Sequence, residues 1–364
     1  MSVTSVPKEH SRALAVHQIN PLADSRWAAF LERHPRSSVF HSSAWLEALR
    51  QTYGYEPVAY TTSPLGAALR NAIVFCRVNS WLTGLRLVSL PFSDHCEPLF
   101  DDEANLDRLL VTIERQLLTK KYRYVELRPI ATAVPITNSV FRSTYSYCFH
   151  QLDLRPEIDT LFANCHVSRR RNIRRAEREG LHYEDGRSEA LLDVFLELYS
   201  QTRRRHRAPP QPKSWFVNLI SRFGDALKIR VANQDGRAVA AILTLRYKET
   251  ITYKYGCSDE KSNHLAGMHF LMWRTIQEAK REGLKVLDLG RSDCSNEGLI
   301  RFKDRFGSTR YTLTYSRFAK SADSKDHYGQ AIDSWRQCAA KAMVSKVPDV
   351  IFSWIGAALY RHFG

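Results

Sequence analysis

The order of periodic segments between residues 227 and 315 constrains the fold of this chain more than any other feature. Alternating apolar residues predict a strand over Leu227–Ala232, and Asp235-Gly236 is a hairpin turn signal. Apolar residues on both faces predict a central strand over Ala238–Tyr247, and a further strand over Ile251–Cys257 follows a tight turn. Connections this short indicate an antiparallel meander.

The period of the pattern then changes from two to 3.6 residues. Apolar residues recur at helical spacing over 265–279 and the helix ends at Gly283, directly before the short apolar strand Val286–Leu289. Asn296 can cap a second amphipathic helix, and the strand Tyr311–Tyr315 ends the unit. A crossover joins the strands on either side of the first helix, so we expect those two strands to be parallel.

The first half of the chain also alternates helical and extended signals. Ser42 or Ser43 can cap a helix that Gly54 stops, and short strands, a helix and another strand follow. Alternation of this kind predicts an α/β protein built from two modules, each a mixed, mostly antiparallel sheet flanked by helices. We divide the chain into a diverged N-terminal module (1–152), a C-terminal module (153–320) and a helical tail (321–364).

A formal net charge of +15 over 364 residues implies an anionic partner: nucleic acid, an acidic membrane face or a phosphate-rich substrate. The charge is densest in an arginine run on a predicted helix at about 167–180, within which Arg171 and Arg174 are candidate substrate-binding residues. Like charges one turn apart destabilise a helix, so we favour anion binding over a simply solvated face.

Nothing in the sequence indicates secretion, a structural metal or a membrane span. The seven cysteines are scattered without a C-x-x-C pair, and no apolar run approaches about 18 residues. We therefore expect a cytoplasmic protein without a metal site. The apolar, aromatic segment Val347–Gly364 either packs on the body or lies at the inner face of a membrane, and packing is favoured.

Several residues fall where an α/β sheet commonly binds ligands. Asp288 and Arg291 lie at the carboxyl end of a strand, where Asp288 could accept a proton from an amine or could hold Arg291 in an ion pair. Arg291 could offer paired donors to a carboxylate or phosphate. Tyr255, alternating with Tyr253 onto one predicted strand face, could protonate a leaving group or belong to the core. We also expect the loop that begins at Asp94 to line the cleft that binds the acceptor, with Asp94 as its best candidate substrate-binding residue.

A second group of candidates precedes the helix that begins near residue 268. Free N–H groups at a helix start favour a phosphate, although a small residue needed for packing is an equal alternative. This predicted phosphate loop comprises His264, Leu265, Ala266, Gly267 and Met268.

Several phrases resemble the FemAB-like branch of the GNAT acyltransferases, which includes the CelD-type enzymes. They are SRRRNIRRAEREG (168–180), ITYKYGCSDE (251–260), LMWRTIQEAKREGLKVLDLGRS (271–292), EGLIRFKDRFGS (297–308), VFHSSAWLEAL (39–49) and LPFSDHCEPLF (90–100). The resemblance covers most of the chain and implies tandem GNAT-like modules with a cleft on or beside the second. It also implies that Lys303, in its Phe-Lys context, contacts donor or acceptor and stabilises an oxyanion, where the residue alone would suggest a surface lysine.

The usual GNAT pyrophosphate signature, Gln/Arg-x-x-Gly-x-Gly/Ala, is absent and only His264–Gly267 approximates it. Our main expectation is an acyltransferase that moves an acetyl-like group from acyl-CoA (acetyl-CoA) to an amine or hydroxyl of a cell-envelope or exopolysaccharide precursor, phosphorylated or lipid-linked. One alternative is a FemAB-type ligase that uses aminoacyl-tRNA. The other is a non-catalytic protein on the same fold that binds RNA or membrane.

Overall fold

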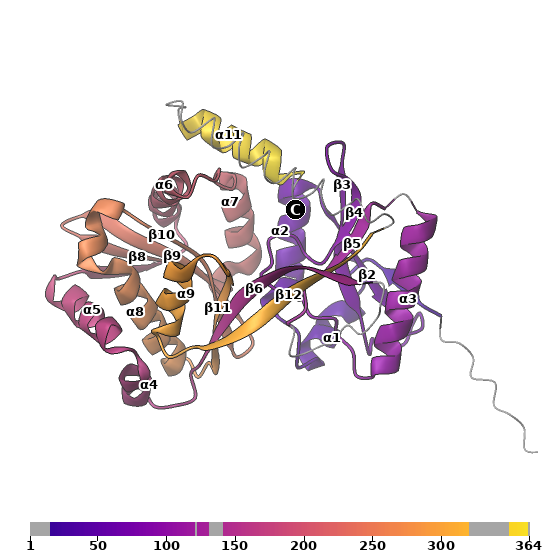
Figure 1. Cartoon of the computed structure of the whole chain (residues 1–364), viewed down its shortest axis with the longest axis horizontal. Coiled ribbons are helices and arrows are strands. Elements are labelled where there is room, and N and C mark those ends of the chain that lie inside the picture. The colour runs from indigo at the N-terminus through magenta and orange to yellow at the C-terminus, as the bar shows by residue number, and fades with distance from the viewer. Residues whose placement is uncertain (1–14, 121, 131–140, 320–348, 363–364) are drawn as a thin grey trace, which may run out of the picture.

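The computed structural model describes residues 15–120, 122–130, 141–319 and 349–362, and Figure 1 shows their arrangement. The N-terminal half contains β1 (His17–Ile19), α1 (Arg26–Arg33), α2 (Ser43–Tyr53), β2 (Glu56–Thr61), β3 (Ile73–Ser80), β4 (Gly84–Val88), α3 (Glu103–Thr119), β5 (Tyr124–Leu127) and β6 (Arg142–Asp153). The C-terminal half contains α4 (Ile158–Asn164), α5 (Val167–Arg178), β7 (His182–Gly186), α6 (Glu189–Arg205), α7 (Lys213–Phe223), β8 (Leu227–Gln234), β9 (Arg237–Tyr247), β10 (Thr250–Ser258), α8 (Gly267–Arg281), β11 (Val286–Asp293), α9 (Glu297–Asp304) and β12 (Thr309–Ala319). A last described helix, α11 (Asp349–Tyr360), follows.

Local sequence signals set the helix ends. The hydroxyl of Ser42 accepts a hydrogen bond from the N–H of Trp45, which selects Ser42 over Ser43 as the cap of α2. Gly54 ends that helix with a φ of 72°, a conformation that glycine adopts without strain. The side chain of Asn296 accepts from the N–H of Leu299 and starts α9 as expected.

One sheet runs through the described part of the molecule. It holds twelve strands in the order β1-β2-β3-β4-β5-β12-β6-β11-β10-β9-β8-β7. The pairs β4·β5 and β10·β11 are parallel, each joined through a helix, and the neighbouring pairs are antiparallel. The predicted mixed, mostly antiparallel α/β fold and the parallel crossover pair are therefore confirmed.

The halves exchange strands at the centre of the sheet. β6 leaves the N-terminal half and pairs with β11, whereas β12 of the C-terminal half pairs with β5. β6 and β12 also pair with each other over most of their lengths, as the crossing strands of Figure 1 show. This exchange fixes the two halves against one another and places loops of one half beside strands of the other.

Helices cover both faces of the sheet. α2, α6 and α7 share one apolar cluster that runs across both halves, with Trp45 and Trp215 in edge contact at its centre. α5 and α8 pack on a separate cluster in the C-terminal half, and α3 packs on another in the N-terminal half. The continuous cluster beneath α2 and α7 supports the region where the halves meet.

The expectation that Tyr253 and Tyr255 share a strand face is wrong. The register of β10 against β9 shifts between these residues, because a bulge at Lys254 interrupts the regular alternation. Tyr253 packs on the α5–α8 cluster, and Tyr255 packs on the cluster beneath α6 and α7. The bulge also turns Lys254 toward the centre of the molecule, where it meets a loop of the N-terminal half.

Candidate functional site

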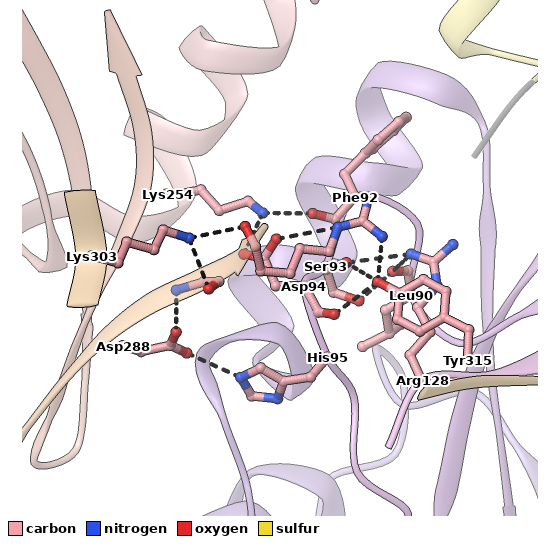
Figure 2. Close-up of polar contacts among 12 residues, drawn as sticks. Leu90, Phe92, Ser93, Asp94, His95, Arg128, Lys254, Asp288, Lys303 and Tyr315 are labelled. Carbon is pink, nitrogen blue, oxygen red and sulfur yellow. Dashed lines mark hydrogen bonds and ion pairs between the residues drawn. The ribbon is translucent and has the colours of Figure 1, made fainter. Parts of the chain in front are cut away.

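The parallel strands β10 and β11 separate soon after they begin. Only Thr250–Thr252 pair with Val286–Asp288, after which the bulge in β10 and an irregularity in β11 carry the strands apart. The loop Leu90–Asp94 of the N-terminal half reaches this opening (Figure 2). A Cβ placed on Gly290 would lie 3.1 Å from Asp94 Oδ2 and 3.7 Å from the carbonyl oxygen of Tyr253, so the loop meets both strands there.

Asp94 is the carboxylate at the centre of this opening. Its Oδ2 accepts a hydrogen bond from Lys254 Nζ at 3.0 Å, and its Oδ1 lies 3.8 Å from Arg291 Nε. Burial alone would raise the pKa of Asp94, but Lys254, Arg291 and Lys303 together hold that pKa below its ordinary value. The predicted site residues Asp94, Arg291 and Lys303 are thus brought together by the fold.

The Leu90–Asp94 loop is held in an unusual conformation. Leu90 has a φ of 39° and Phe92 a φ of 62°, a region that costs a non-glycine residue about 1–3 kcal/mol. Lys254 Nζ donates to the carbonyl oxygen of Phe92 at 2.7 Å, and Arg128 Nη1 donates to that of Leu90 at 3.1 Å. Contacts from both halves therefore hold the strained loop.

Lys303 of α9 is buried, which excludes the exposed-lysine alternative. It is 2% exposed, and its ammonium donates to the carbonyl oxygens of Gly290 at 2.9 Å and Arg291 at 3.0 Å. The pKa of Lys303 is lowered to about 8, chiefly by burial; Asp94 and Asp288 oppose the shift, and the cations Lys254 and Arg291 add to it. Within the described residues the third N–H of the ammonium has no acceptor, so it can serve an oxygen of a bound substrate.

Asp288 shapes the turn that Lys303 binds. Its Oδ1 accepts from the N–H of Gly290 at 2.7 Å, and its Oδ2 lies 3.0 Å from His95 Nε2. Burial lowers the pKa of His95, but the hydrogen bond and charge of Asp288 outweigh it and raise that pKa above its ordinary value. Because both oxygens of Asp288 have protein partners, its geometry suits positioning better than proton transfer.

Arg291 and two tyrosines complete the cluster. Arg291 Nη1 donates to Tyr315 Oη at 2.7 Å, and its guanidinium lies 4.5 Å from the ring centre of Tyr147. Tyr315 Oη in turn donates to the carbonyl oxygen of Asp94 at 2.8 Å. Tyr147 and Tyr315 come from the exchanged strands β6 and β12, so the exchange itself builds this side of the cluster.

The hydroxyl of Tyr255 is not brought to this cluster. It accepts from Trp215 Nε1 at 2.9 Å within the aromatic core, and burial raises its pKa well above the ordinary value. Sequence reasoning missed Lys254 and Tyr315, and within the loop Asp94–Glu97 it selected Asp94 and not His95. The phrase LPFSDHCEPLF drew attention to the loop of His95, but no signal distinguished Lys254 between two tyrosines or Tyr315 on an ordinary strand.

The predicted phosphate loop has a packing role that the structure explains. A Cβ on Gly267 would lie 3.0 Å from both Val239 Cγ2 and Ala240 Cβ, so the glycine lets α8 approach β9 closely. Ala266 has a φ of 61° just before the helix. In this loop His264 is exposed, Leu265 and Ala266 are buried, and Met268 is half-buried.

A basic groove lies beside α5, α8 and α9. Arg171 and Arg174 are exposed on α5, whereas Arg169 is 4% exposed and its guanidinium stacks on the rings of Phe302 and Phe306 at 4.7 and 4.9 Å. Burial lowers the pKa of Arg169 to about 10, and the charge of Arg305 acts in the same direction. The groove encloses about 320 Å³ and is lined by Arg169, Asn172, His269, Gly298, Arg301, Phe302 and Arg305.

A cavity of about 290 Å³ lies between the halves, and His95, Glu97, Thr252 and Asp288 are among its lining residues. No three His, Cys, Asp or Glu side chains of the described residues gather into a metal-binding group. Across the same part of the chain, every helix is too short or too polar to span a membrane. Helix α11 packs on the body, where Phe352 lies 4.6 Å from the guanidinium of Arg204.

The C-terminal half of the chain matches known proteins in sequence. A model of the acetyltransferase (GNAT) domain family matches residues 167–304. A UDP-N-acetylmuramoylpentapeptide-lysine N(6)-alanyltransferase from Weissella viridescens is 28% identical over 137 residues. That match spans 37% of this chain and 40% of the length of the relative.

Solved structures show the same fold over most of the chain. FemX superimposes with a TM-score of 0.64 at 13% identity, covering 82% of this chain and 96% of FemX. The C-terminal domain of a putative lysylphosphatidylglycerol synthetase from Agrobacterium fabrum gives 0.55 at 15% identity, with coverage of 84% and 96%. A tandem GNAT protein from the clavulanic acid pathway gives 0.52 at 11% identity, with coverage of 84% and 99%.

These comparisons correct the expected donor. The Weissella viridescens relative is named for moving an alanyl group, which is an aminoacyl group, to the N6 amine of a lysine in a peptide-bearing precursor. The expected acyl-CoA (acetyl-CoA) donor and exopolysaccharide acceptor are therefore wrong. Gly267 packs closely against β9. Packing therefore explains why a glycine occupies this position, and no bound pyrophosphate is needed to account for it.

Proposed function

We propose that this chain, a member of the FemAB-like branch of the GNAT acyltransferases, transfers an aminoacyl group from aminoacyl-tRNA to an amine of a cell-envelope precursor. The observation that carries the proposal is Lys303, a buried ammonium fixed by two carbonyl oxygens beside the carboxylate of Asp94. The ester carbonyl of the aminoacyl group carries no formal charge until an amine attacks it, and a negative charge then develops on its oxygen. A fixed cation beside that oxygen favours the transition state over the bound ester.

The reaction follows from these positions. The acceptor nitrogen attacks the ester carbonyl carbon, a C–N bond forms, and the third N–H of Lys303 donates to the oxyanion. Asp94, ionised at neutral pH, orients the amine, whose proton passes to the leaving ribose oxygen. The C–O bond to the ribose then breaks, and the ribose oxygen leaves as a hydroxyl after taking up the proton. Asp288 acts as a positioning residue, because it holds the Gly290 turn whose carbonyl oxygen fixes Lys303.

The basic groove supports RNA as the carrier of the donor. Its wall includes Phe302, which precedes Lys303 on α9, so one helix carries both a wall of the groove and the catalytic lysine. Exposed arginines of α5, Arg171 and Arg174 among them, would extend contact along a phosphate backbone. Membrane contact through the tail and the N-terminal module's contribution to acceptor binding stay predictions.

A transfer assay tests this function. The purified chain is incubated with a mixture of radiolabelled aminoacyl-tRNAs and with UDP-N-acetylmuramoylpentapeptide, and label in the peptide is measured. Lys303→Gln should lower transfer by about 100-fold or more, the usual effect of losing one oxyanion donor. Lys261→Gln, which alters an exposed lysine, is the matched control. Absence of transfer from every aminoacyl-tRNA by a folded, RNA-binding protein would instead support the non-catalytic alternative.

A further inference from the structure

The C-terminal helix α11 contacts both halves of the molecule next to the candidate site. In Figure 1 it extends from above α6 and α7 toward the N-terminal half. Gly356 lies directly on the chain at Pro210, because a Cβ there would lie only 2.1 Å from the carbonyl oxygen of Pro210. Beyond the helix, the carbonyl oxygen of His362 accepts from Thr83 Oγ1 at 2.8 Å and from Arg86 Nη2 at 2.6 Å. The docking is therefore specific on both sides of the seam between the halves.

Tyr360, the last residue of α11, has polar contacts in both halves. Its hydroxyl donates to the carbonyl oxygen of Pro209 at 2.9 Å and accepts from Arg203 Nη2 at 2.8 Å. Its own carbonyl oxygen accepts from the hydroxyl of Tyr55. These bonds leave the tyrosine ring little freedom to turn.

The ring of Tyr360 packs edge-on against Phe92 at 5.6 Å between ring centres. The ring of Phe92 is also contacted by Tyr53, Tyr55 and Trp215, at 4.9, 6.3 and 5.9 Å between ring centres. Phe92 is one of the two residues with a strained, positive φ in the Leu90–Asp94 loop, and its carbonyl oxygen accepts from Lys254. A strained backbone persists only where surrounding contacts hold it, so the aromatic contacts of Phe92 bear directly on where Asp94 lies.

We propose that Tyr360 is a positioning residue: through Phe92 it holds the strained loop that presents Asp94 to Lys254, Arg291 and Lys303. The proposal rests on the proposed function only for its effect on transfer. Its structural part, that α11 fixes the loop, stands independently of any substrate. Docked α11 thus favours a catalytically competent site, and released α11 leaves the loop free to relax.

Hydrogen–deuterium exchange measured by mass spectrometry tests the structural part without substrate. Tyr360→Ala should raise amide exchange in residues 90–96 by about fivefold, the factor that an aromatic pair of ordinary strength supplies. Tyr360→Phe keeps the ring and should retain most of the protection. Unchanged exchange over 90–96 in Tyr360→Ala would overturn the proposal.

A second pair of variants acts at a distance from the loop. Gly356→Leu should force α11 away from Pro210 and raise exchange both in α11 and over 90–96. Ala358→Leu places the same side chain on the exposed side of the helix and should change neither region. If Gly356→Leu frees α11 while the loop stays protected, α11 has no role in positioning.

The transfer assay separates this inference from the proposed function. Tyr360→Ala should lower kcat by about fivefold and leave KM for the aminoacyl-tRNA nearly unchanged, because the tyrosine acts through Asp94 and not on the RNA. A wild-type chain that shows no transfer, with exchange changed as expected, refutes the function and leaves the positioning role standing. An active chain whose Tyr360→Ala variant keeps both its kcat and its loop protection refutes the positioning role alone.

Discussion

In wild type the free energy of unfolding should rise with pH above about 8, because the ammonium of Lys303 is buried. Replacing Lys303 by methionine should remove this rise. The side chain is 2% exposed, and burial lowers its pKa from 10.5 to about 8. Below pH 8 both folded and unfolded chains hold the proton, and the folded state carries the full cost of a buried charge. Between pH 8 and 10.5 the folded chain has released the proton and the unfolded chain has not, so the free energy of unfolding rises with pH.

The size of the effect follows from the same pKa. Each pH unit in this window adds about 1.4 kcal/mol, so wild type should gain about 2–3 kcal/mol relative to Lys303→Met between pH 8 and pH 10. The variant also deprives the carbonyl oxygens of Gly290 and Arg291 of a donor, but that loss does not depend on pH and does not affect the comparison.

Urea unfolding at pH 7, 8, 9 and 10 measures the difference, with Lys261→Met as the control for removal of an exposed lysine. If the difference in the free energy of unfolding between wild type and Lys303→Met stays constant over this range, the lowered pKa of Lys303 is refuted. Transfer by wild type should decline as the pH rises past about 8, because only the protonated lysine can donate to the oxyanion.

Three further substitutions test the site. Asp94→Asn should abolish most transfer and lower the free energy of unfolding by about 3 kcal/mol, because Lys254 loses its carboxylate partner. Urea unfolding measures the second effect, with Asp101→Asn, at a largely exposed carboxylate, as the control. Gly290→Ala should lower transfer more than Gly283→Ala, because both have positive φ but only at Gly290 does the added methyl meet Asp94; parallel transfer assays decide. Arg169→Gln should weaken binding of uncharged tRNA and flatten its salt dependence by about one charge, in a titration from 50 to 200 mM salt.

The sequence predicted the modules because their periodicity is local. The meander, the change to helical spacing and the parallel pair around α8 each depend on residues close in the chain, and the caps at Ser42 and Asn296 do so as well. The exchange of β6 and β12 could not be predicted this way. Both strands are rich in Thr, Ser and Tyr, which suit a strand without specifying its neighbour, and only the assembled sheet selects β11 and β5 as their partners.

Only part of the site could be predicted from the sequence. Asp94, Arg291 and Lys303 belong to recognisable phrases, so they could be named before their positions were known. Lys254 also lies in one of these phrases, but it could not be placed at the site, because a single-residue bulge turns it away from the regular alternation of the strand. The prediction that Tyr253 and Tyr255 share one strand face was wrong because of that same bulge, which no spacing rule detects.

The charges of the cluster explain why such a site needs a rigid, shared sheet. Lys254, Arg291 and Lys303 face the carboxylates of Asp94 and Asp288, so three cations face two anions and a positive excess of one remains. Repulsion between these cations would drive an adaptable structure apart, and the exchanged strands oppose that movement by fixing Tyr315 against both Arg291 and the Asp94 loop. A substrate that develops negative charge during the reaction relieves the excess, whereas a neutral ground-state ester does not. The arrangement that destabilises the unliganded fold is therefore the one that stabilises the transition state.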